Sequence, residues 1–428
     1  MTKKLSYINI AAVLLALLLI LMPFHAALVT IYGNFLPYKT ALMVWKEVLI
    51  IIIGILCTYA VYKDRSLIKL DIINKIAIGI LLFSLFISLI NFSELSALLF
   101  GIKTNLVVFV LFLEAQVLAS KYNYVNILKI VLIPASIVAI IAILQPVIFK
   151  PELLNMIGYG TDSIDSTQYV ESAQDSIRVF STLGGPNQLG AYLIIPFTLS
   201  LALAIKSRKI IWYLLPLFFV FPIYMSYSRS AWIGSIVAAI TVVLMQFKFK
   251  IQLIVGMIII LLLATFGYLF YSGGVCKYYS DPIGILVHGS CQSGNLGGSD
   301  MIRVNSIQNG INSITSNPLG SGVGTAGPAS FYTSKPLIVE NWYIQIAIEI
   351  GLIGLMLYLA FIIMNLKKLY KDSLHKEYSV FPITLFASLC GILVASLFLH
   401  TLADSTLSIL LFGLLGIVIS HRFKDQTP

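Results

Sequence analysis

The feature that most limits how this chain can fold is a succession of apolar runs, each long enough to cross a lipid bilayer. A helix needs about 20 mainly apolar residues to span the hydrocarbon core. Twelve runs of about this length, separated by turn or charged residues, predict twelve transmembrane helices. They are 7–24, 41–62, 72–90, 95–118, 125–148, 187–205, 210–227, 229–247, 251–271, 340–364, 378–399 and 405–421. Polar residues interrupt the run 95–118 at Lys103, Asn105 and Glu114, which makes it the least regular of the twelve.

The composition favours an all-α polytopic membrane protein. Hydrophobic residues make up 59% of the chain and charged residues 11%, whereas soluble domains contain about 25% charged residues. We therefore expect residues 1–428 to form a single integral membrane domain. The first apolar run follows Lys3 and Lys4 and is not followed by a clear small-residue cleavage site. We interpret it as a retained signal anchor.

The net charge of +10 would suit a nucleic-acid ligand, but the positions of the basic residues indicate membrane topology instead. With the amino terminus in the cytoplasm, the basic connections all fall on the cytoplasmic side, as the positive-inside rule requires. We expect a protein of the cytoplasmic membrane with both termini in the cytoplasm and no nucleic-acid partner. The basic connections contain Lys63, Arg65 and Lys69; Lys121; Lys206, Arg208 and Lys209; Lys248 and Lys250; Lys367, Lys368, Lys371 and Lys376; and Arg422 and Lys424.

Two of the expected outer loops, 149–186 and 272–339, are much longer than the others. The first contains the polar run "GTDSIDSTQYVESAQDSIR", which is typical of a solvated face or a short surface helix. The second predicts a helix on the outer membrane surface, with Ser299 or Asp300 as its cap. Its apolar stripe would consist of Ile307, Ile311 and Ile314.

The four cysteines fall into two groups. Cys57 and Cys390 lie within expected spans, where cysteine behaves as a small apolar residue. Cys276 and Cys291 share the second outer loop, an oxidising location, so they form either a disulfide or two free thiols. His288 is the only histidine near them, and no zinc site is expected.

Three arginines depart from the positive-inside pattern, because Arg178, Arg229 and Arg303 are all expected at the outer boundary of the membrane. A boundary arginine can simply extend to lipid headgroups. Three on the face that otherwise avoids positive charge favour a functional role.

Helix starts at the same boundary strengthen this interpretation. The spans that begin near 187, 229 and 340 would point their amino termini outward, where unpaired N–H groups favour anions. Asn187 follows a Gly-Gly-Pro turn, and Ser228 is placed to cap the helix of Arg229. The pattern predicts an outward-facing site for a lipid-linked phosphate or diphosphate.

Glu340, in "IVENWYIQIAIEIGLIGL", is the candidate general base of this site. Its alternative role is electrostatic, because a carboxylate is favourable in the first turn of any helix. Glu349 would point to the opposite side of the same helix, so the two glutamates are not expected to act as a pair. Trp342 fits either an interfacial aromatic belt or stacking on a sugar ring.

The stretch "NPLGSGVGTAGPAS" precedes this span. It lacks the ending of a nucleotide-binding loop. Its glycines form either a flexible loop or a place where backbone approaches a ligand closely. They are Gly320, Gly322 and Gly324.

Four segments together resemble the O-antigen ligase and O-antigen polymerase superfamily: "RVFSTLGGPNQLGAYL", "YSRSAWIG", "NPLGSGVGTAG" and "ENWYIQIAIEIGLIGL". The resemblance implies the GT-C-like architecture of lipid-dependent glycosyltransferases, with about twelve spans and a large outer loop. It also implies transfer of glycan from an undecaprenyl diphosphate carrier, without a nucleotide sugar or another cofactor. The acceptor would lie on the outer side of the membrane.

Matching the motifs residue by residue implies roles for the boundary residues. Arg229 and Arg303 would hold the diphosphate, and Arg178 corresponds to a basic residue before the Pro-Asn turn. Further candidates for binding the diphosphate or the glycan, independent of this match, are Asn187, Asn341 and Trp342. The chain departs from the family at Glu340, where lipid A-core ligases have a histidine. This departure favours a polymerase of surface polysaccharide, with Glu340 as its base.

The expected reaction is an inverting, metal-independent displacement in which an acceptor hydroxyl attacks the anomeric carbon. An O-antigen-type ligase and a protein O-oligosaccharyltransferase remain alternatives. A flippase or transporter of a lipid-linked or anionic solute is the rival of another class, although its charges are usually near the midplane. Few charges here are so placed: Lys46, Glu47, Lys103 and Glu114. A sensor or structural role ranks last. A flippase or a chain-length regulator is a candidate partner.

Overall fold

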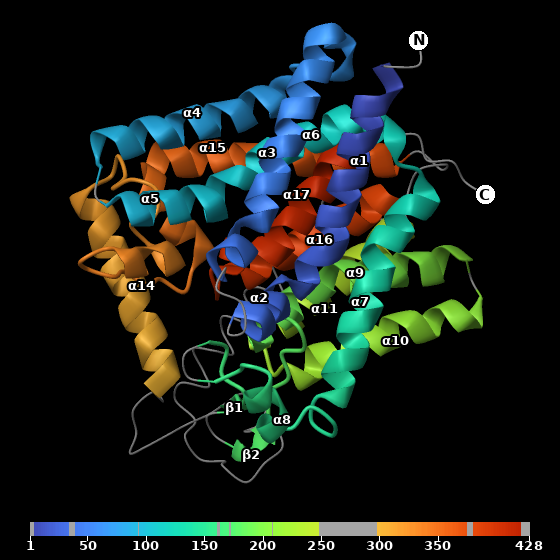
Figure 1. Cartoon of the computed structure of the whole chain (residues 1–428), viewed down its shortest axis with the longest axis vertical. Coiled ribbons are helices and arrows are strands. Elements are labelled where there is room, and N and C mark those ends of the chain that lie inside the picture. The colour runs from blue at the N-terminus through green and yellow to red at the C-terminus, as the bar shows by residue number, and fades with distance from the viewer. Residues whose placement is uncertain are drawn as a thin grey trace.

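The structure is a computed structural model of the chain, and it describes residues 4–33, 39–92, 94–160, 163–170, 173–207, 209–247, 298–374 and 380–420. These residues form a mainly helical bundle (Figure 1). The amino-terminal half contains α1 (Lys4–Leu21), η1 (Met22–Phe24), α2 (His25–Gly33), α3 (Lys39–Lys63), η2 (Arg65–Leu67), α4 (Ile72–Ile90), α5 (Leu95–Gly101), η3 (Ile102–Leu106), α6 (Val107–Leu118), η4 (Ala119–Lys121), α7 (Tyr124–Leu144) and α8 (Pro151–Met156). The rest contains β1 (Tyr169–Val170), β2 (Ala173–Ile177), α9 (Pro186–Ser207), α10 (Ile210–Met225), α11 (Arg229–Gln246), α14 (Gly298–Ser316), η5 (Gly327–Tyr332), α15 (Trp342–Ser373), α16 (Val380–Ala395), η6 (Thr401–Ala403) and α17 (Ser405–Ile419).

Eight helical segments in the described ranges are long and apolar enough to cross a membrane. Three further apolar helices are shorter: Trp212–Met225, Val380–Ala395 and Ser405–Ile419. Eleven of the twelve expected runs therefore form apolar helices. The run 251–271 lies outside the described residues. The protein is a helical membrane protein, as the sequence predicted.

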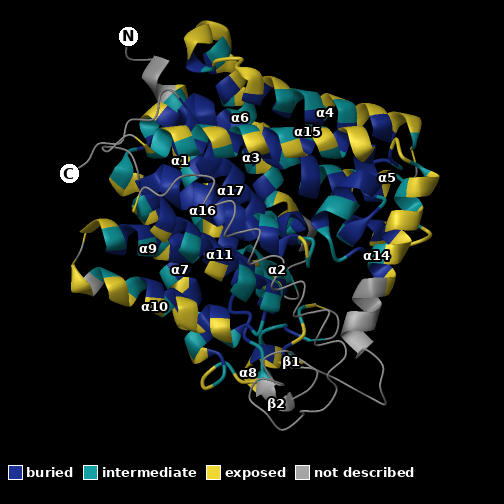
Figure 2. Ribbon diagram, turned by 180° about the vertical axis from the view of Figure 1, so that it is seen from behind, coloured by how far each residue is buried: buried dark blue, intermediate teal, exposed yellow. Residues whose placement is uncertain are grey.

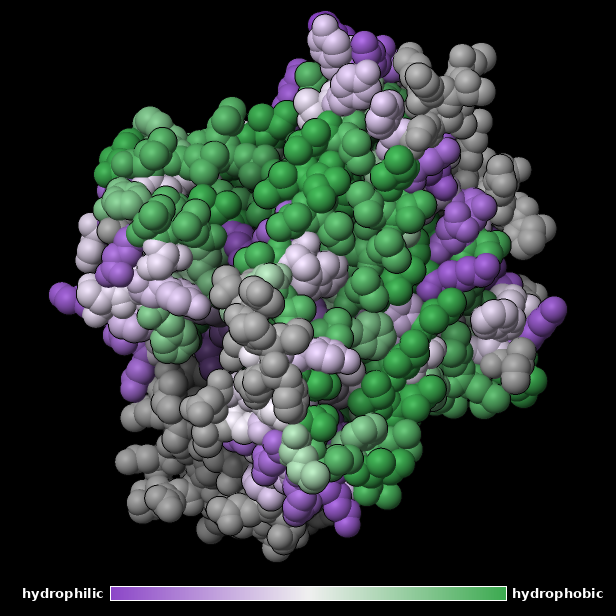
Figure 3. Space-filling model, in the orientation of Figure 1, coloured by the Kyte–Doolittle hydropathy of each residue, from purple (hydrophilic) through white to green (hydrophobic). Residues whose placement is uncertain are grey.

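Many apolar side chains remain at the surface of the bundle, which is where lipid replaces water in a membrane protein. Ile51, Leu82 and Leu217 are each more than 60% exposed. In Figure 3 hydrophobic residues form a broad area across the middle of the face, and hydrophilic residues lie mainly around its edges.

The centre of the bundle is formed by α9, α11, α16 and α17, and nearly all residues of α16 and α17 are buried (Figure 2). Small residues allow close packing there. A Cβ atom on Gly234 of α11 would lie 2.7 Å from the carbonyl oxygen of Gly391 in α16. On the other side of α17, edge-to-face phenylalanine pairs join α6 to α15, with ring centroids of Phe109 and Phe361 5.2 Å apart.

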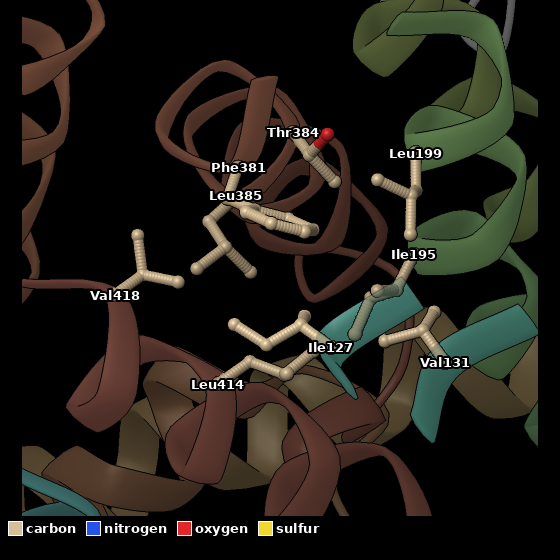
Figure 4. A pocket seen from close by; sticks show the side chains of 9 residues that line it. All are labelled: Ile127, Val131, Ile195, Leu199, Phe381, Thr384, Leu385, Leu414 and Val418. Atoms are coloured by element: carbon tan, nitrogen blue, oxygen red, sulfur yellow. The ribbon is translucent and has the colours of Figure 1, made fainter. Parts of the chain in front are cut away.

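A small cavity lies between α7, α9, α16 and α17 (Figure 4). It measures about 10 Å³, and eight of its nine lining residues are apolar. Thr384 is the single exception. Because a trapped water needs two to four polar partners, this lining does not suit a bound water. The cavity is a packing defect near the start of α16 and is remote from the candidate site described below.

The irregular run 95–118 does form one candidate span, Leu95–Lys121. Its interruption appears as the π-helical turn η3, which includes Lys103 and Asn105. A π turn inserts one extra residue into an α-helix and is often found at functional sites. The sequence therefore located both the span and its break.

The first long loop agrees with one of its two expectations, a solvated face, and not with the other, a short surface helix. It contains the short helix α8 followed by an antiparallel hairpin in which Tyr169 pairs with Ile177. The strands are two and five residues long, too short and too polar for the alternation that identifies a strand in sequence. The polar run thus forms a small hairpin rather than a surface helix.

The helix α14 was predicted, but its start and packed face differ. It begins at Gly298, so Ser299 and Asp300 lie inside its first turn instead of capping it. The face against α15 is formed around Gly310, where a Cβ atom would lie 2.5 Å from Ile344. Ile311, from the expected stripe, is 44% exposed. Ile314, from the same stripe, is partly buried and packs against the cluster that contains Val339 and Ile348. The predicted stripe is therefore used in part, together with the close backbone approach at Gly310.

Candidate functional site

Four helices of the bundle begin close together at one end, which we name the arginine end. They are α9, α11, α15 and α17, with first residues Pro186, Arg229, Trp342 and Ser405. The backbones of Gly234 in α11 and Gly391 in α16 touch. Arg229 lies five residues before Gly234, and Ser396 lies five residues after Gly391. Each is therefore about 7.5 Å from the contact along its helix. The amide of Trp342 donates to the carbonyl of Ser396, 3.0 Å away. The starts of α11 and α15 are therefore level with each other.

The turn η6 completes this arrangement, because it precedes α17 and contacts α9 and α15. In Figure 1 the arginine end faces the hairpin, α8 and α14, and the start of α1 and the end of α17 lie away from it. Converging helix starts collect N–H groups and partial positive charge at one place. This is the electrostatic setting that the sequence predicted for three of the four helices.

Arg178 joins three segments at the arginine end. Its Nε donates to the carbonyl of Ser226 at 3.1 Å, and its Nη2 donates to Oδ1 of Asn187 at 2.9 Å. Ser226 lies three residues before Arg229, and Asn187 is in the first turn of α9. The structure thus brings Arg178, Asn187 and the helix start of Arg229 together.

Arg229 follows a strained turn. Tyr227 has a φ of 49°, a left-handed conformation that is unusual for a bulky residue and typical of functional sites. The ring of Tyr224 stacks on Trp232 at 5.6 Å, and Trp232 Nε1 donates to the carbonyl of Ile223. These contacts fix the turn from which Arg229 projects.

Ser228 occupies the N-cap position of α11, as expected, but its side chain does not cap the helix. Its hydroxyl lies 3.2 Å from that of Ser230 instead. The predicted helix start is confirmed, but the capping hydrogen bond expected from the Ser228 side chain does not form.

Glu340 lies two residues before α15, and Asn341 is the cap of that helix. The Asn341 side chain accepts from the amide of Ile344 at 3.0 Å and donates to the carbonyl of Leu397 at 2.9 Å. Trp342 is 3% exposed and packs edge-on against Tyr358. The Asn341 side chain and the backbone amide of Trp342 therefore anchor the start of α15 to the residues that follow α16. Glu340 and Asn341 remain partly exposed, whereas Trp342 is buried.

His400 is a site residue that the sequence reasoning missed. Its ring lies beside Glu340 and the carbonyl of Val339, and its Nδ1 is buried without a hydrogen-bond partner among the described residues. Burial lowers the pKa of His400, although Glu340 and the Val339 carbonyl act in the opposite direction. The sequence feature that could have identified His400 is its position in the short connection between two expected spans, 378–399 and 405–421.

The predicted glycine loop is tightly packed rather than flexible. Gly324 has a φ of 90°, and a Cβ atom there would collide with the backbone of Ala97 in α5. Glu349, which is 1% exposed, accepts from Nδ2 of Asn105 at 2.6 Å and from Gln345. The loop is therefore held between α5 and α15, and Glu349 has a structural partner of its own, away from Glu340.

The remaining predicted residues are only partly described. Arg303 lies on α14, seven residues before the glycine that packs on α15, and its side chain lies outside what the structure describes. Cys276 and Cys291 also lie outside the described residues. Within the described ranges, no group of three or more acidic, histidine or cysteine side chains could hold a metal ion.

Comparison with known proteins agrees with the resemblance noted above. Residues 214–359 match the family model described as O-antigen ligase. The matched segment extends from α10 into α15 and contains Arg229, Arg303 and Glu340. A search among curated proteins gave no match.

Proposed function

We propose that this member of the O-antigen ligase and polymerase superfamily is a glycosyltransferase that uses an undecaprenyl diphosphate-linked glycan as donor. The observation that supports it best is the convergence of Arg178, Arg229, Glu340 and His400 at helix starts on one end of the bundle. Cations and helix amino termini suit a diphosphate, and the carboxylate beside an imidazole suits a proton acceptor. We place this end outside the cytoplasmic membrane and both termini in the cytoplasm.

The proposed reaction is a single displacement. An acceptor hydroxyl oxygen forms a bond to the anomeric carbon while the bond from that carbon to the diphosphate oxygen breaks. The hydroxyl proton passes to Glu340, beside which the His400 ring lies. Arg178, Arg229 and Arg303 offset the charge that grows on the leaving diphosphate, a role that a metal ion has in other enzymes. Inversion at the anomeric carbon follows from the single displacement.

Within this class we favour a polymerase of surface polysaccharide, because Glu340 stands where the ligases that the chain resembles have a histidine. The glycan would then be both donor and acceptor. A ligase or a protein O-oligosaccharyltransferase would use the same donor site with another hydroxyl. A flippase, which would supply the carrier-linked glycan, or a chain-length regulator is the candidate protein partner of such a polymerase.

The test is glycan transfer by purified protein in liposomes that contain undecaprenyl diphosphate oligosaccharide. We expect wild type to form longer glycans, and Arg229→Ala and Glu340→Gln to lose at least a hundredfold in rate while eluting as folded, monodisperse protein. Lys150→Ala, an exposed basic residue at the start of α8, is the matched control and should retain full activity. Movement of the carrier between leaflets without transfer to any acceptor would instead identify a flippase.

A further inference from the structure

A second group of charged side chains lies on α3 and η3, outside the segment that matches the family. Oε1 of Glu47 is 3.4 Å from Nζ of Lys46 and 3.7 Å from Nζ of Lys103. Lys46 also lies 2.9 Å from Nε2 of His25, whose Nδ1 accepts from Nε1 of Trp45. The sequence suggests only a boundary pair here, whereas the structure joins three elements into one polar cluster.

This cluster retains unused hydrogen-bonding capacity. Oε2 of Glu47 is buried and has no partner among the described residues. The side chains of Lys103 and Glu47 are 20% and 18% exposed, whereas that of Lys46 is 3% exposed. An ammonium group offers three donors and a carboxylate only acceptors. Donors and acceptors side by side at a partly open position suit a ligand rich in hydroxyl groups.

Aromatic rings adjoin these charges. Nζ of Lys103 lies 5.4 Å from the ring centroid of Phe100, and Phe100 packs on Tyr332 of η5 with centroids 5.1 Å apart. Tyr332 is 45% exposed. A sugar has an apolar C–H face and a hydroxylated rim. An exposed aromatic ring with polar groups nearby is therefore a combination that binds sugars.

The aromatic pair is held in place rather than loosely exposed. The amide of Ser334 donates to Oε1 of Glu94 at 2.9 Å, and the hydroxyl of Ser96 donates to the carbonyl of Tyr332 at 3.4 Å. These bonds fasten η5 to the start of α5. A fixed ring loses little entropy when it binds a ligand.

The aromatic pair of Phe100 and Tyr332, which we name the platform, is connected to the candidate site. The chain runs from Tyr332 to Glu340 in eight residues and folds back on the way, because the amide of Gly327 donates to the carbonyl of Leu337. The turn η3 also contacts η6, the turn that follows His400. A glycan seated on the platform would therefore lie near Glu340 without occupying the positions of Arg178 and Arg229.

We propose that Phe100, Tyr332, Lys103 and Glu47 form a saccharide-binding site, separate from the diphosphate site, that holds the acceptor glycan. Saccharide binding by these four residues does not depend on the proposed function. Its assignment to the acceptor rests on the proposed function. The competing explanation is an aromatic belt at the membrane boundary beside an ordinary ion pair, and that explanation predicts no saccharide binding.

The test uses the lipid-free oligosaccharide released by mild acid from the carrier-linked glycan of the source cells. Isothermal titration calorimetry measures the binding, because the chain contains four tryptophans and its fluorescence would not report on Trp45 alone. We expect saturable binding by wild type and about tenfold weaker binding by Tyr332→Ala and by Lys103→Gln. Tyr332→Phe, which preserves the ring, should bind as wild type does. Phe331→Ala removes a neighbouring ring that is 69% exposed and should also leave affinity unchanged.

Transfer assays separate this site from the transferase proposal. Tyr332→Ala and Lys103→Gln should raise the acceptor KM about tenfold and leave the donor KM unchanged. Saccharide affinity that does not change in folded Tyr332→Ala and Lys103→Gln would overturn the site, even if transfer proceeds. Tyr332-dependent binding by a wild-type protein that transfers glycan to no acceptor would support the site and refute the proposed function.

Discussion

Replacing Arg178 by lysine tests whether its geometry or only its charge matters. The guanidinium bonds two acceptors on different segments, Ser226 at 3.1 Å and Asn187 at 2.9 Å. A lysine ammonium is a point charge on a flexible stem and cannot reproduce this fork. Loss of one charge-assisted hydrogen bond corresponds to about 1.5–3 kcal/mol, which is roughly 10- to 150-fold in kcat/KM if Arg178 positions the donor.

The assay is glycan transfer at limiting donor, with Asn187→Ala and the double variant completing a cycle. If the 2.9 Å contact positions the guanidinium for catalysis, the two effects should be non-additive by about 1 kcal/mol. Equal activity of Arg178→Lys and wild type, or strict additivity with Asn187→Ala, would refute the reasoning. Thermal unfolding of each variant and of wild type in one detergent checks that the variants are folded.

Three further predictions concern packing, pH and metal. Gly234→Ala places a methyl group against the Gly391 carbonyl and should lower stability by about 1–3 kcal/mol, whereas Gly79→Ala, which meets no atom within 4 Å, should not; thermal unfolding of both variants measures this. Because the pKa of His400 is below its ordinary value of 6.5, the unfolded chain binds more protons, so stability should fall as pH decreases below about 6.5, and His400→Gln should flatten that dependence. Transfer should persist in EDTA, and an EDTA loss that Mg²⁺ restores would contradict the metal-independent mechanism.

Local signals made part of this fold predictable. The run 72–90 coincides with α4, Ile72–Ile90, because Asp71 caps it and the apolar pattern continues to Asn91. The break at Lys103 was visible for the same reason, since polar residues interrupt an apolar run. The start of α11 at Arg229 was also predicted, because Ser228 occupies its N-cap position, although the Ser228 side chain does not form the capping bond. In each case the information lies within a few residues of the feature.

What the sequence did not reveal depends on contacts between distant segments. His400 reaches Glu340 because the start of α15 is anchored to the end of α16 through Ser396. Gly324 is rigid because α5 packs against it, and no local pattern distinguishes such a glycine from one in a mobile loop. Trp342 likewise resembled an exposed boundary aromatic until the structure showed it to be 3% exposed.

The central claim is that this chain breaks the bond between a glycan and its diphosphate carrier at the arginine end. The most direct measurement counts undecaprenyl diphosphate released and glycosidic bonds formed by purified protein in liposomes, for wild type and Arg229→Ala. We expect one carrier released per bond formed, inversion at the anomeric carbon, and neither product from the variant. Glycosidic bonds formed at the wild-type rate by Arg229→Ala, or none formed by wild type while the carrier crosses the membrane, would contradict it.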